Sequence, residues 1–294
     1  MTRRMRRTRP IDALLLVDKP PGITSHDVVS VARRALGEKR IGHAGTLDPF
    51  ATGLLVLLTG RATRVLPYVD GEPKEYEATI RWGSETDTDD ATGTVTRESA
   101  LAVPTAASIE RGIATLTGHL DQLPPSYSAK QVGGRRAHAA ARRGAPLTLA
   151  PAAVQVHSWR VRAQRANETD VTIVCGAGTY IRALARDLGR ATNNAAHLSA
   201  LRRTRSGPFD VARAASFADL RDGRASLHSP REAIPSLAAQ CMTSEDAARL
   251  ARGMRVSASI AGERAALVSE DGTLLAIAER SGSEWQPRVV LANE

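Results

Sequence analysis

The stretch GHAGTLDPFATG, residues 42–53, concentrates residue types that can do chemistry. It holds one histidine, His43, and one carboxylate, Asp48, among three glycines and a proline. Because glycine and proline together permit an unusual backbone, the Asp48 carboxylate can be aimed into a cleft, where such a group can act as a nucleophile or a base. The alternative is a turn aspartate that bonds its own backbone. The residues alone favour this turn interpretation.

A second stretch, residues 176–189, opens with glycines that can bring backbone N–H groups to a phosphate at a helix start. The chain contains no GxGxxG and no GxxxxGK[ST] motif. Arg182 and Arg186 lie one helical turn apart, so a carboxylate can pair with either. The default interpretation of these arginines is a solvated charged face shared with Asp187.

Tyr76 is a third candidate. It shares a predicted strand face with Ile80 and Trp82, so core packing is its default role. The chain has only four tyrosines, however, so few tyrosine rings are available to stack on a nucleobase.

The overall charge points to a polyanionic partner. The 294 residues carry a formal net charge of +9 and a sequence pI of about 10.3. Only four of the 40 basic residues are lysine, and arginine forks onto phosphates and stacks on bases. Codon bias in an alanine-rich chain explains arginine over lysine but not the excess of positive charge. Nucleic acid is therefore the favoured partner.

The same composition excludes other classes. The two cysteines, Cys175 and Cys241, lie far apart without histidines at ligand spacing, so neither a disulfide framework nor a metal site is expected. No apolar stretch reaches the length of a membrane span. Asp12 interrupts a short apolar run that mimics a signal peptide. We predict a cytoplasmic protein whose residues 1–10 form a disordered basic arm.

Hydrophobic periodicity places these candidates on elements. Strands are predicted at residues 14–17, 54–58, 74–83, 154–161, 170–175 and 201–209. Helices are predicted from a Ser25 cap to Gly37, near Gly60, at 105–117 and at 176–192. The acidic stretch 84–95 fails the calcium-loop pattern and is interpreted as a solvated turn.

Two further segments bear on ligand binding. The Gly- and Pro-punctuated insertion 122–149 is a candidate for gripping an RNA backbone through Lys130, Arg135, Arg136, Arg142 and Arg143. A boundary is predicted near Ile234, which divides a catalytic domain, 11–234, from a small domain, 235–294. The small domain is predicted to be mostly β, with a helix at 244–252 and a hairpin around Gly272.

Six blocks of the chain, in this order, resemble the bacterial tRNA pseudouridine synthase B family: LLLVDKPPGITSHDVV, RIGHAGTLDPFATGLL, KEYEATIRWGSETDTDDATG, PPSYSAKQVGGRRAH, CGAGTYIRALARDLG and LRRTRSGPF. The resemblance covers residues 12–210. It implies an α+β pseudouridine synthase fold with a mixed, largely antiparallel central sheet flanked by helices. The last 60 residues resemble, more weakly, an RNA-binding PUA domain.

The resemblance also implies roles for single residues. Asp48 matches the catalytic aspartate, and Tyr76 matches the tyrosine that stacks on the flipped uracil. Arg182 matches an arginine that pairs with the aspartate. Four further matches follow: Tyr180 and Leu201 lining the uracil pocket, His43 filling the place that the target base leaves, and Lys19 near the site with a less defined role.

The implied activity is conversion of uridine 55 in the tRNA T-loop to pseudouridine. It requires no cofactor, because nothing is oxidised and no external group is transferred. The expected partner is the T-arm stem-loop of tRNA, and a monomer without an obligate protein partner or membrane contact is expected. A non-catalytic RNA-binding protein or tRNA-folding chaperone stays the alternative. A guide-RNA-dependent enzyme is a third option, which the short C-terminal part disfavours.

Overall fold

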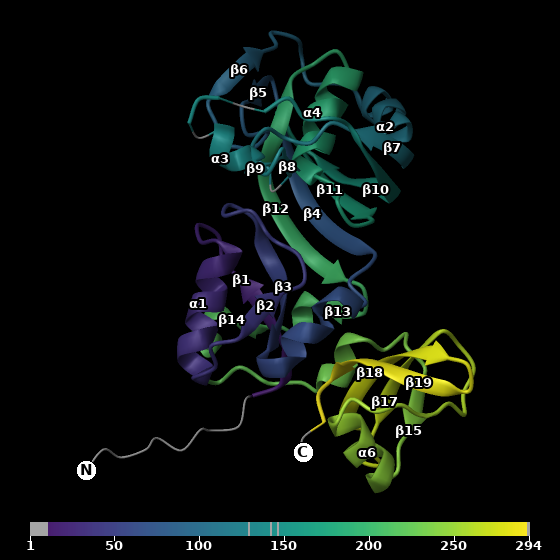
Figure 1. Cartoon of the computed structure of the whole chain (residues 1–294). Coiled ribbons are helices and arrows are strands. Elements are labelled where there is room, and N and C mark those ends of the chain that lie inside the picture. The colour runs from purple at the N-terminus through teal and green to yellow at the C-terminus, as the bar shows by residue number, and fades with distance from the viewer. Residues whose placement is uncertain (1–10, 129, 142, 146, 293–294) are drawn as a thin grey trace. The chain divides into compact units, whose positions relative to one another are not determined.

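The computed structural model describes residues 11–128, 130–141, 143–145 and 147–292, which form two compact units (Figure 1). The described part of unit one comprises residues 11–49, 53–71 and 208–292. That of unit two comprises residues 50–52 and 72–207, apart from the gaps just given. Each unit therefore collects segments that lie far apart in the sequence.

Unit one is built around β1 (Ala13–Lys19). This strand pairs antiparallel with β3 (Thr52–Thr59) and parallel with β14 (Ala215–Ser216). The short strand β2 (Ile41–His43) adds to β3. The strands predicted at 14–17 and 54–58 are confirmed. Both are apolar throughout, as expected of strands that are covered on two faces.

The two faces of β1 and β3 pack into different hydrophobic clusters. Leu15 and Val17 pack with α1 (Ser25–Leu36) and α5 (Phe217–Arg221). Leu14 and Leu16 pack with the 3₁₀ helix η1 (Gly60–Tyr68) and with the C-terminal strands. Each fully buried leucine contributes about 1.5–3 kcal/mol to the free energy of folding relative to an exposed one. The strands β1 and β3, which are covered on both faces, therefore hold the loop that enters β3 in place.

The C-terminal part of unit one is a five-stranded sheet in the order β15-β17-β18-β19-β16, with helix α6. Its elements are β15 (Ala239–Cys241), α6 (Ser244–Ala251), β16 (Val256–Ser257), β17 (Arg264–Val268), β18 (Leu274–Ser281) and β19 (Glu284–Val290). The buried Trp285 and Leu250 belong to a core between sheet and helix. The predicted helix, hairpin and mostly-β character are confirmed. The domain boundary near Ile234 and the PUA likeness stay predictions.

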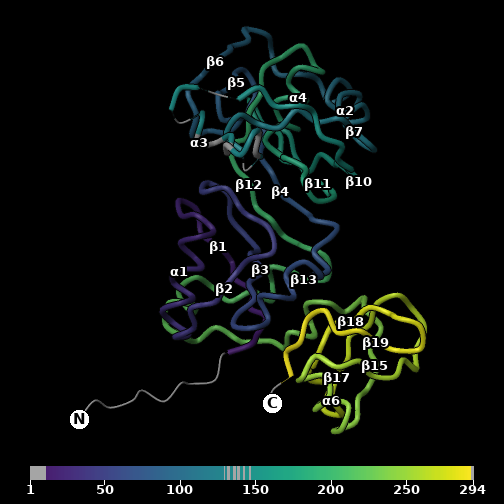
Figure 2. Tube along the Cα trace, in the orientation of Figure 1, coloured from purple at the N-terminus to yellow at the C-terminus, as the bar shows by residue number. Residues whose placement is uncertain are grey.

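Unit two contains an antiparallel sheet in the order β12-β4-β11-β10-β7. Its strands are β4 (Lys74–Trp82), β7 (Gly118–Gln122), β10 (Ala152–Gln164), β11 (Glu168–Cys175) and β12 (Ala196–Ser206). Figure 2 shows β4 and β12 running side by side along their whole length. Helix α4 (Ile181–Ala191) packs on β12, and α2 (Ala106–Thr115) packs beside α4.

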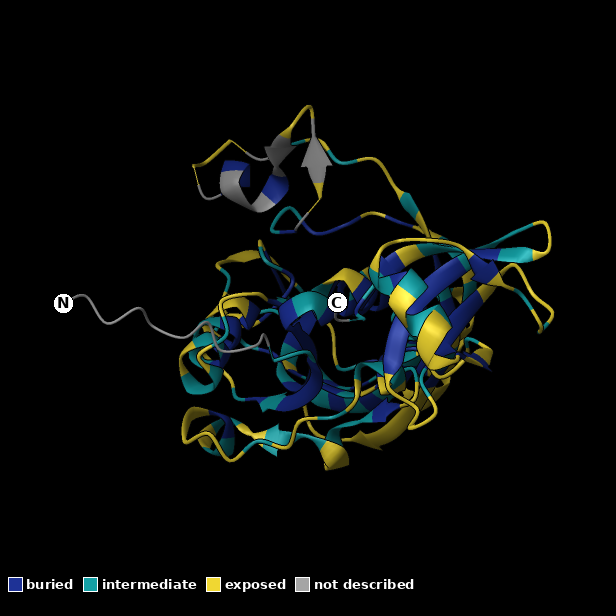
Figure 3. Ribbon diagram, turned by 60° about the horizontal axis from the view of Figure 1, so that its bottom comes forward, coloured by how far each residue is buried: buried dark blue, intermediate teal, exposed yellow. Residues whose placement is uncertain are grey.

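Burial follows the predicted strand pattern in unit two. Tyr76, Ala78, Ile80 and Trp82 are buried, and the residues between them are half-buried or exposed. Figure 3 colours the chain by burial, and buried residues lie along many of its strands and helices. The mixed, largely antiparallel sheet structure with flanking helices agrees with the predicted fold class.

Short elements complete the chain. In unit two these are β5 (Ser84–Thr86), β6 (Val95–Glu98), β8 (Gln131–Val132), β9 (Arg135–Arg136) and α3 (Ala137–Ala141). In unit one they are β13 (Phe209–Asp210), η2 (Val211–Arg213) and η3 (Pro230–Ala233). Residues 1–10, predicted to be a disordered arm, lie outside the described residues. Among the helices that are described, none is long and apolar enough to cross a membrane.

Candidate active site

The backbone around Asp48 bends at two glycines, one in the loop between β2 and β3 and one at the start of β3. The backbone angle φ is 108° at Gly45 and 100° at Gly53, a region that glycine adopts at little cost. The unusual backbone predicted from the sequence is therefore confirmed at both positions. Ala44 N donates to Val56 O over 2.9 Å, which ties the start of the loop to β3. Asp48 itself is half-buried.

Both neighbours of Asp48 are held by hydrogen bonds within unit one. Leu47 N donates to Ser25 Oγ over 2.9 Å, and Ser25 Oγ donates to Leu47 O at 3.1 Å. On the other side, Pro49 O accepts from Gly22 N at 2.8 Å. The backbone that carries the carboxylate is thus anchored immediately before and after it.

The predicted role of Ser25 as the helix cap is wrong. Thr24 is the cap of α1: its Oγ1 accepts from Asp27 N at 3.1 Å, and the Asp27 carboxylate accepts from Thr24 N at 2.8 Å. Ser25 is the first helical residue and is buried. Its hydroxyl is therefore available to the loop that holds Asp48.

Lys19 is a second anchor of this loop. It is fully buried, and its Nζ donates to Pro20 O at 2.9 Å, Ile23 O at 2.8 Å and Pro49 O at 3.2 Å. These three acceptors use all three N–H groups of an ammonium. Burial lowers the pKa of Lys19 to about 8, against the opposing effect of the Asp48 carboxylate. At neutral pH the loop therefore carries a buried positive charge that acts on Asp48.

His43 ends the strand that leads into the same loop. It is half-buried, and its Cα is paired with that of Leu57 on β3. Unit one thus brings together His43, Asp48 and Lys19, three of the residues singled out from the sequence.

Tyr76 lies on β4, between β12 and β11 in the sheet of unit two. Its cross-strand neighbours are Ile173 on β11 and Arg203 on β12. The residue is 8% exposed, in agreement with the core-packing interpretation. Its stacking role on a uracil stays a prediction.

Tyr180 is the residue that precedes the first turn of α4. Its N–H donates to Gln122 Oε1 at 2.8 Å, and its carbonyl accepts from Gln122 Nε2 at 3.1 Å. One buried amide side chain from β7 therefore satisfies both backbone groups of Tyr180. Because of these two bonds, the backbone of Tyr180 is fixed at the helix start. The residue itself is half-buried.

Arg182 is buried, with only 4% of its surface exposed. Its Nη1 donates to Thr88 O at 2.7 Å and its Nη2 donates to Tyr127 O at 3.0 Å. Its Nε lies 3.8 Å from a carboxylate oxygen of Asp90. The guanidinium therefore ties the start of α4 to two loops of unit two.

Arg186, one turn further along α4, is buried in the same way. It pairs with Asp89 at 2.9 Å and with Asp187 at 2.9 Å, and it donates to Leu123 O at 2.9 Å. Burial raises the pKa of Asp89 to about 6, although Arg186 and Arg182 act in the opposite direction. The prediction of a solvated arginine face is therefore wrong.

The acidic stretch 84–95 is only in part the solvated turn that we predicted: Asp87 and residues 91–92 and 94–95 are exposed, but three of its carboxylates are not. Glu85, Asp89 and Asp90 are each less than a tenth exposed. The strands β5 and β6 form a hairpin, and Glu85 on β5 and Asp89 in the turn pair with Arg190 and Arg186 of α4. Within the described residues no group of three or more His, Cys, Asp or Glu side chains is placed to hold a metal ion.

The structure gives the burial of three of the remaining predicted site residues, and their roles stay predictions. Leu201 is buried on β12, and its carbonyl accepts from Thr52 Oγ1 at 3.4 Å. In the basic insertion, Lys130 and Arg143 are exposed, as a contact to RNA requires. Arg142 and the side chains of Arg135 and Arg136 lie outside the described part of the chain.

The candidate residues thus form two groups. Unit one holds Lys19, His43 and Asp48, and unit two holds Tyr76, Tyr180, Arg182 and Leu201. The pairing of Arg182 with Asp48, which the resemblance implies, joins residues of different units and stays a prediction. No local pattern in the sequence indicated Gln122 or the role of Ser25. The Asp27 that follows Thr24 by three residues was the available indication that Thr24, not Ser25, is the cap.

Family models match most of the chain. A model described as "TruB family pseudouridylate synthase (N terminal domain)" matches residues 33–181. A model described as "tRNA pseudouridylate synthase B C-terminal domain" matches residues 182–239. The two matches are adjacent and together cover residues 33–239, from the last turn of α1 to the first residue of β15.

Relatives of similar length agree with these matches. The chain is 45% identical to the tRNA pseudouridine synthase B of Leifsonia xyli subsp. xyli over 283 residues, which cover 92% of this chain and 93% of the relative. It is 40% identical to the enzyme of that name from an Arthrobacter species over 297 residues, or 96% and 97% of the two chains.

Among solved structures, the chain resembles one protein in a Cbf5–Nop10–Gar1 complex, with a TM-score of 0.71 and 23% identity over 96% of this chain and 85% of that one. An archaeal box H/ACA Nop10–Cbf5 complex gives the same TM-score and identity. At this identity the likeness concerns the fold alone. With the family models, it confirms the predicted pseudouridine synthase fold.

Proposed function

The chain belongs to the TruB family of pseudouridylate synthases, and from that membership we propose that it isomerises uridine 55 in the T-loop of tRNA to pseudouridine. The names of its relatives support tRNA as the substrate. The net charge of +9 suits a polyanionic substrate such as tRNA. The T-arm stem-loop is the proposed binding determinant, and a monomeric cytoplasmic enzyme is the proposed form.

The reaction breaks the bond from ribose C1′ to uracil N1 and forms a bond from C1′ to C5. The proton on C5 is lost to solvent and N1 gains a proton, so the product is an isomer of the substrate. Nothing is oxidised or reduced and no group is donated, so the proposed reaction uses no cofactor. The target base has to leave its stack before any protein group can reach C1′.

Asp48 is the proposed catalytic carboxylate. The observation that carries this proposal is its setting: the residues on both sides are hydrogen bonded, and the buried ammonium of Lys19 acts on it. A carboxylate held in this way suits attack on C1′. It suits equally a glycal route, in which a base removes the 2′ proton. Both routes need an ionised Asp48.

The other residues have proposed roles in binding. Tyr76 supplies a π face for the flipped uracil, Tyr180 and Leu201 line its pocket, and His43 fills the gap in the T-loop. Arg182 is the proposed counter-charge of Asp48. The phosphates are held by the insertion 122–149, through Lys130, Arg135, Arg136, Arg142 and Arg143, and by the C-terminal domain.

Tritium release from tRNA labelled at uracil C5 tests the proposal. We expect release by the wild type and none by Asp48→Asn, while Asp121→Asn, which removes an exposed carboxylate of β7, releases at the wild-type rate. A tRNA with cytidine at position 55 and label at its other uridines should give no release. Release from that tRNA would contradict the assignment of position 55.

Two other outcomes separate the parts of the proposal. Release by both the wild type and Asp48→Asn would keep the activity and remove Asp48 from the chemistry. Tight tRNA binding without release by either protein would favour a non-catalytic RNA chaperone instead.

A further inference from the structure

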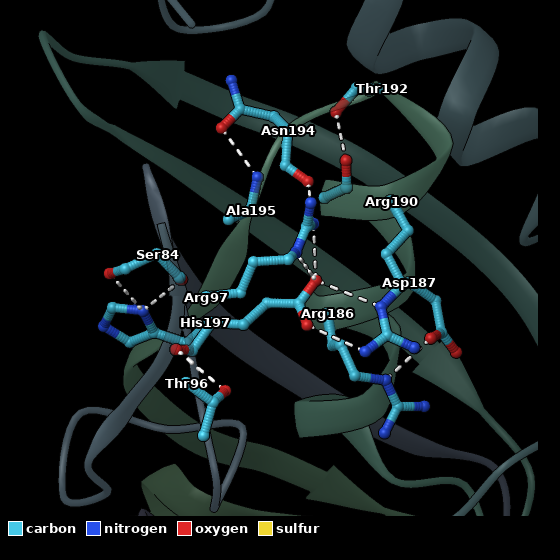
Figure 4. Close-up of polar contacts among 12 residues, drawn as sticks. Ser84, Thr96, Arg97, Arg186, Asp187, Arg190, Thr192, Asn194, Ala195 and His197 are labelled. Carbon is cyan, nitrogen blue, oxygen red and sulfur yellow. Dashed lines mark hydrogen bonds and ion pairs between the residues drawn. The ribbon is translucent and has the colours of Figure 1, made fainter. Parts of the chain in front are cut away.

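Two arginines of unit two converge on one buried carboxylate. Arg97 on β6 donates to Glu85 Oε1 through Nε at 3.1 Å and through Nη2 at 2.7 Å. Arg190, in the last turn of α4, donates to Oε1 through Nε at 3.1 Å and to Oε2 through Nη2 at 2.8 Å. Figure 4 shows the guanidiniums of Arg97 and Arg190 on either side of one carboxylate, and Arg97 Nη2 also donates to Asn194 O. Glu85 is only 5% exposed, and its four hydrogen bonds hold both guanidiniums in place.

Each arginine keeps donors that point away from Glu85. The side chains of Arg97 and Arg190 are 45% and 53% exposed. Among the described residues, neither Nη1 has a hydrogen-bond partner. The two arginines line an open depression of about 450 Å³ together with Glu85, Asn193 and Asn194. The exposed Asn193 adds an amide donor at its rim.

This pair differs from the two arginines that precede it on α4. Arg182, Arg186 and Arg190 follow one another at intervals of four residues and share one helix face. The first two are buried and are bonded to carboxylates and backbone carbonyls, which is the pattern of a structural tie. Arg190 instead shares a single carboxylate with Arg97 and is half exposed. Of the charged residues that line the depression, two are positive and one is negative.

We propose that Arg97 and Arg190 form a phosphate-binding site for the RNA backbone, at a phosphodiester away from the target uridine. Guanidinium forks match phosphate oxygens, and forks already held by Glu85 lose little side-chain entropy on binding. Arg190 lies eight residues after Arg182, about 12 Å along the helix. The contacted phosphate therefore belongs to a different nucleotide from the target uridine, which the proposed function places near Tyr180 and Arg182. This inference rests on the proposed function only for the identity of the RNA.

A salt titration of RNA binding gives the first test. Wild type, Arg97→Ala and Arg190→Ala are compared for the dissociation constant of a T-arm hairpin RNA. Each substitution should weaken binding about tenfold and should lower the salt slope by about 0.7–0.9, the share of one phosphate contact. We expect KM for tRNA to rise and kcat to stay within about twofold, because no reacting atom is touched.

The matched control is Arg162→Ala. Arg162 is 50% exposed and forms one ion pair with Glu77 at 2.6 Å in the same unit, so its removal costs the same charge and a similar contact. Arg97→Ala or Arg190→Ala also leaves the buried Glu85 with one partner fewer, which destabilises the protein's own β5–β6 hairpin. Arg190→Lys therefore accompanies them, because it keeps the charge beside Glu85 and removes only the fork. It should fold and still bind RNA more weakly than the wild type.

Hairpins with one neutral methylphosphonate linkage locate the contact. At the contacted phosphate, the neutral linkage should weaken wild-type binding and leave the binding of Arg190→Ala and Arg190→Lys almost unchanged. At all other linkages the wild type and the variants should respond alike. One linkage at which the effects of the neutral phosphonate and of the Arg190 substitution do not add supports the proposal.

Two results would overturn it. One is that Arg97, Arg190 and Arg162 variants show the same affinities and the same salt slopes. The other is that no linkage gives a non-additive response. Both are binding results, so they stay distinguishable from a failure of the proposed function, which would show as RNA binding without tritium release by the wild type.

Discussion

Ser25 and Leu47 hold each other through two hydrogen bonds, one in each direction. Leu47 N donates to the Ser25 hydroxyl at 2.9 Å, and that hydroxyl donates to Leu47 O at 3.1 Å. Ser25 is 2% exposed and Leu47 is 4% exposed, so water does not replace either bond. Because Leu47 precedes Asp48, the first residue of α1 sets the position of the proposed catalytic carboxylate. Ser25 is therefore a positioning residue.

Ser25→Ala should lower kcat for pseudouridine formation by about 10- to 100-fold, because a small displacement of a reacting group is costly. The tRNA dissociation constant should change less than threefold. The free energy of unfolding should fall by about 1–3 kcal/mol, the usual cost of leaving a buried polar pair unsatisfied. Tritium release and chemical denaturation measure the two effects.

Thr24→Ala is the control for this variant. It removes the cap of α1 and should cost about 0.5–2 kcal/mol of stability, close to the loss in Ser25→Ala. It leaves the bonds to Leu47 intact, so kcat should stay near the wild-type value. Equal loss of kcat in both variants would mean that stability, not positioning, explains the Ser25 effect.

Lys19 should make stability depend on pH above neutrality. Its pKa is about 8 in the folded chain and 10.5 at its ordinary value. Between these values the unfolded chain binds the lysine proton and the folded chain does not, so the free energy of unfolding rises with pH. The slope is at most about 1.4 kcal/mol per pH unit. The stability difference between wild type and Lys19→Met should therefore grow above pH 8 and be flat from pH 6 to 7.5.

Denaturant unfolding at closely spaced pH values measures this difference. Lys19→Met should be the less stable protein at every pH, because three carbonyl groups lose their donor. A difference that shrinks above pH 8 would contradict the lowered pKa.

Asp89 should give the opposite slope on the acid side. Burial raises its pKa from 3.8 to about 6. Between these values the folded chain binds the proton and the unfolded chain does not, so the free energy of unfolding falls as pH rises. The stability of the wild type minus that of Asp89→Asn should thus fall from pH 4 to 6, by up to about 1.4 kcal/mol per pH unit. Asp121→Asn serves as the control for loss of an exposed carboxylate in the same unit.

The sequence predicted those elements whose pattern is local. The apolar run of β3 and the alternation of β4 each indicate a strand without knowledge of the rest of the chain. The positions of Gly45 and Gly53 indicated the bends around Asp48 for the same reason. What these patterns do not contain is which segment lies against which.

The errors concern residues whose partners are distant along the chain. Asp89 and Glu85 look like solvent-exposed carboxylates because Arg186 and Arg190, which bury them, follow 97 and 105 residues later. Ser25 was interpreted as a cap because its true partner, Leu47, lies 22 residues away in a loop. Local preference favoured a surface role in each case, and tertiary packing produced a buried tie.

Tyr76 offers the sharpest test of a residue role taken from the resemblance. If its ring stacks on the flipped uracil, Tyr76→Phe keeps the π face and should retain activity within about tenfold. Tyr76→Leu keeps much of the buried apolar volume and loses the ring, so kcat/KM should fall by about 100-fold or more, because base stacking is worth about 1–3 kcal/mol and the lost orientation adds to it. Tyr76 is 8% exposed on β4, so Tyr76→Leu also needs a melting curve. Equal stability with unequal activity supports stacking. Loss of activity in Tyr76→Phe with a folded protein would instead assign the hydroxyl to proton transfer, because that variant removes nothing else.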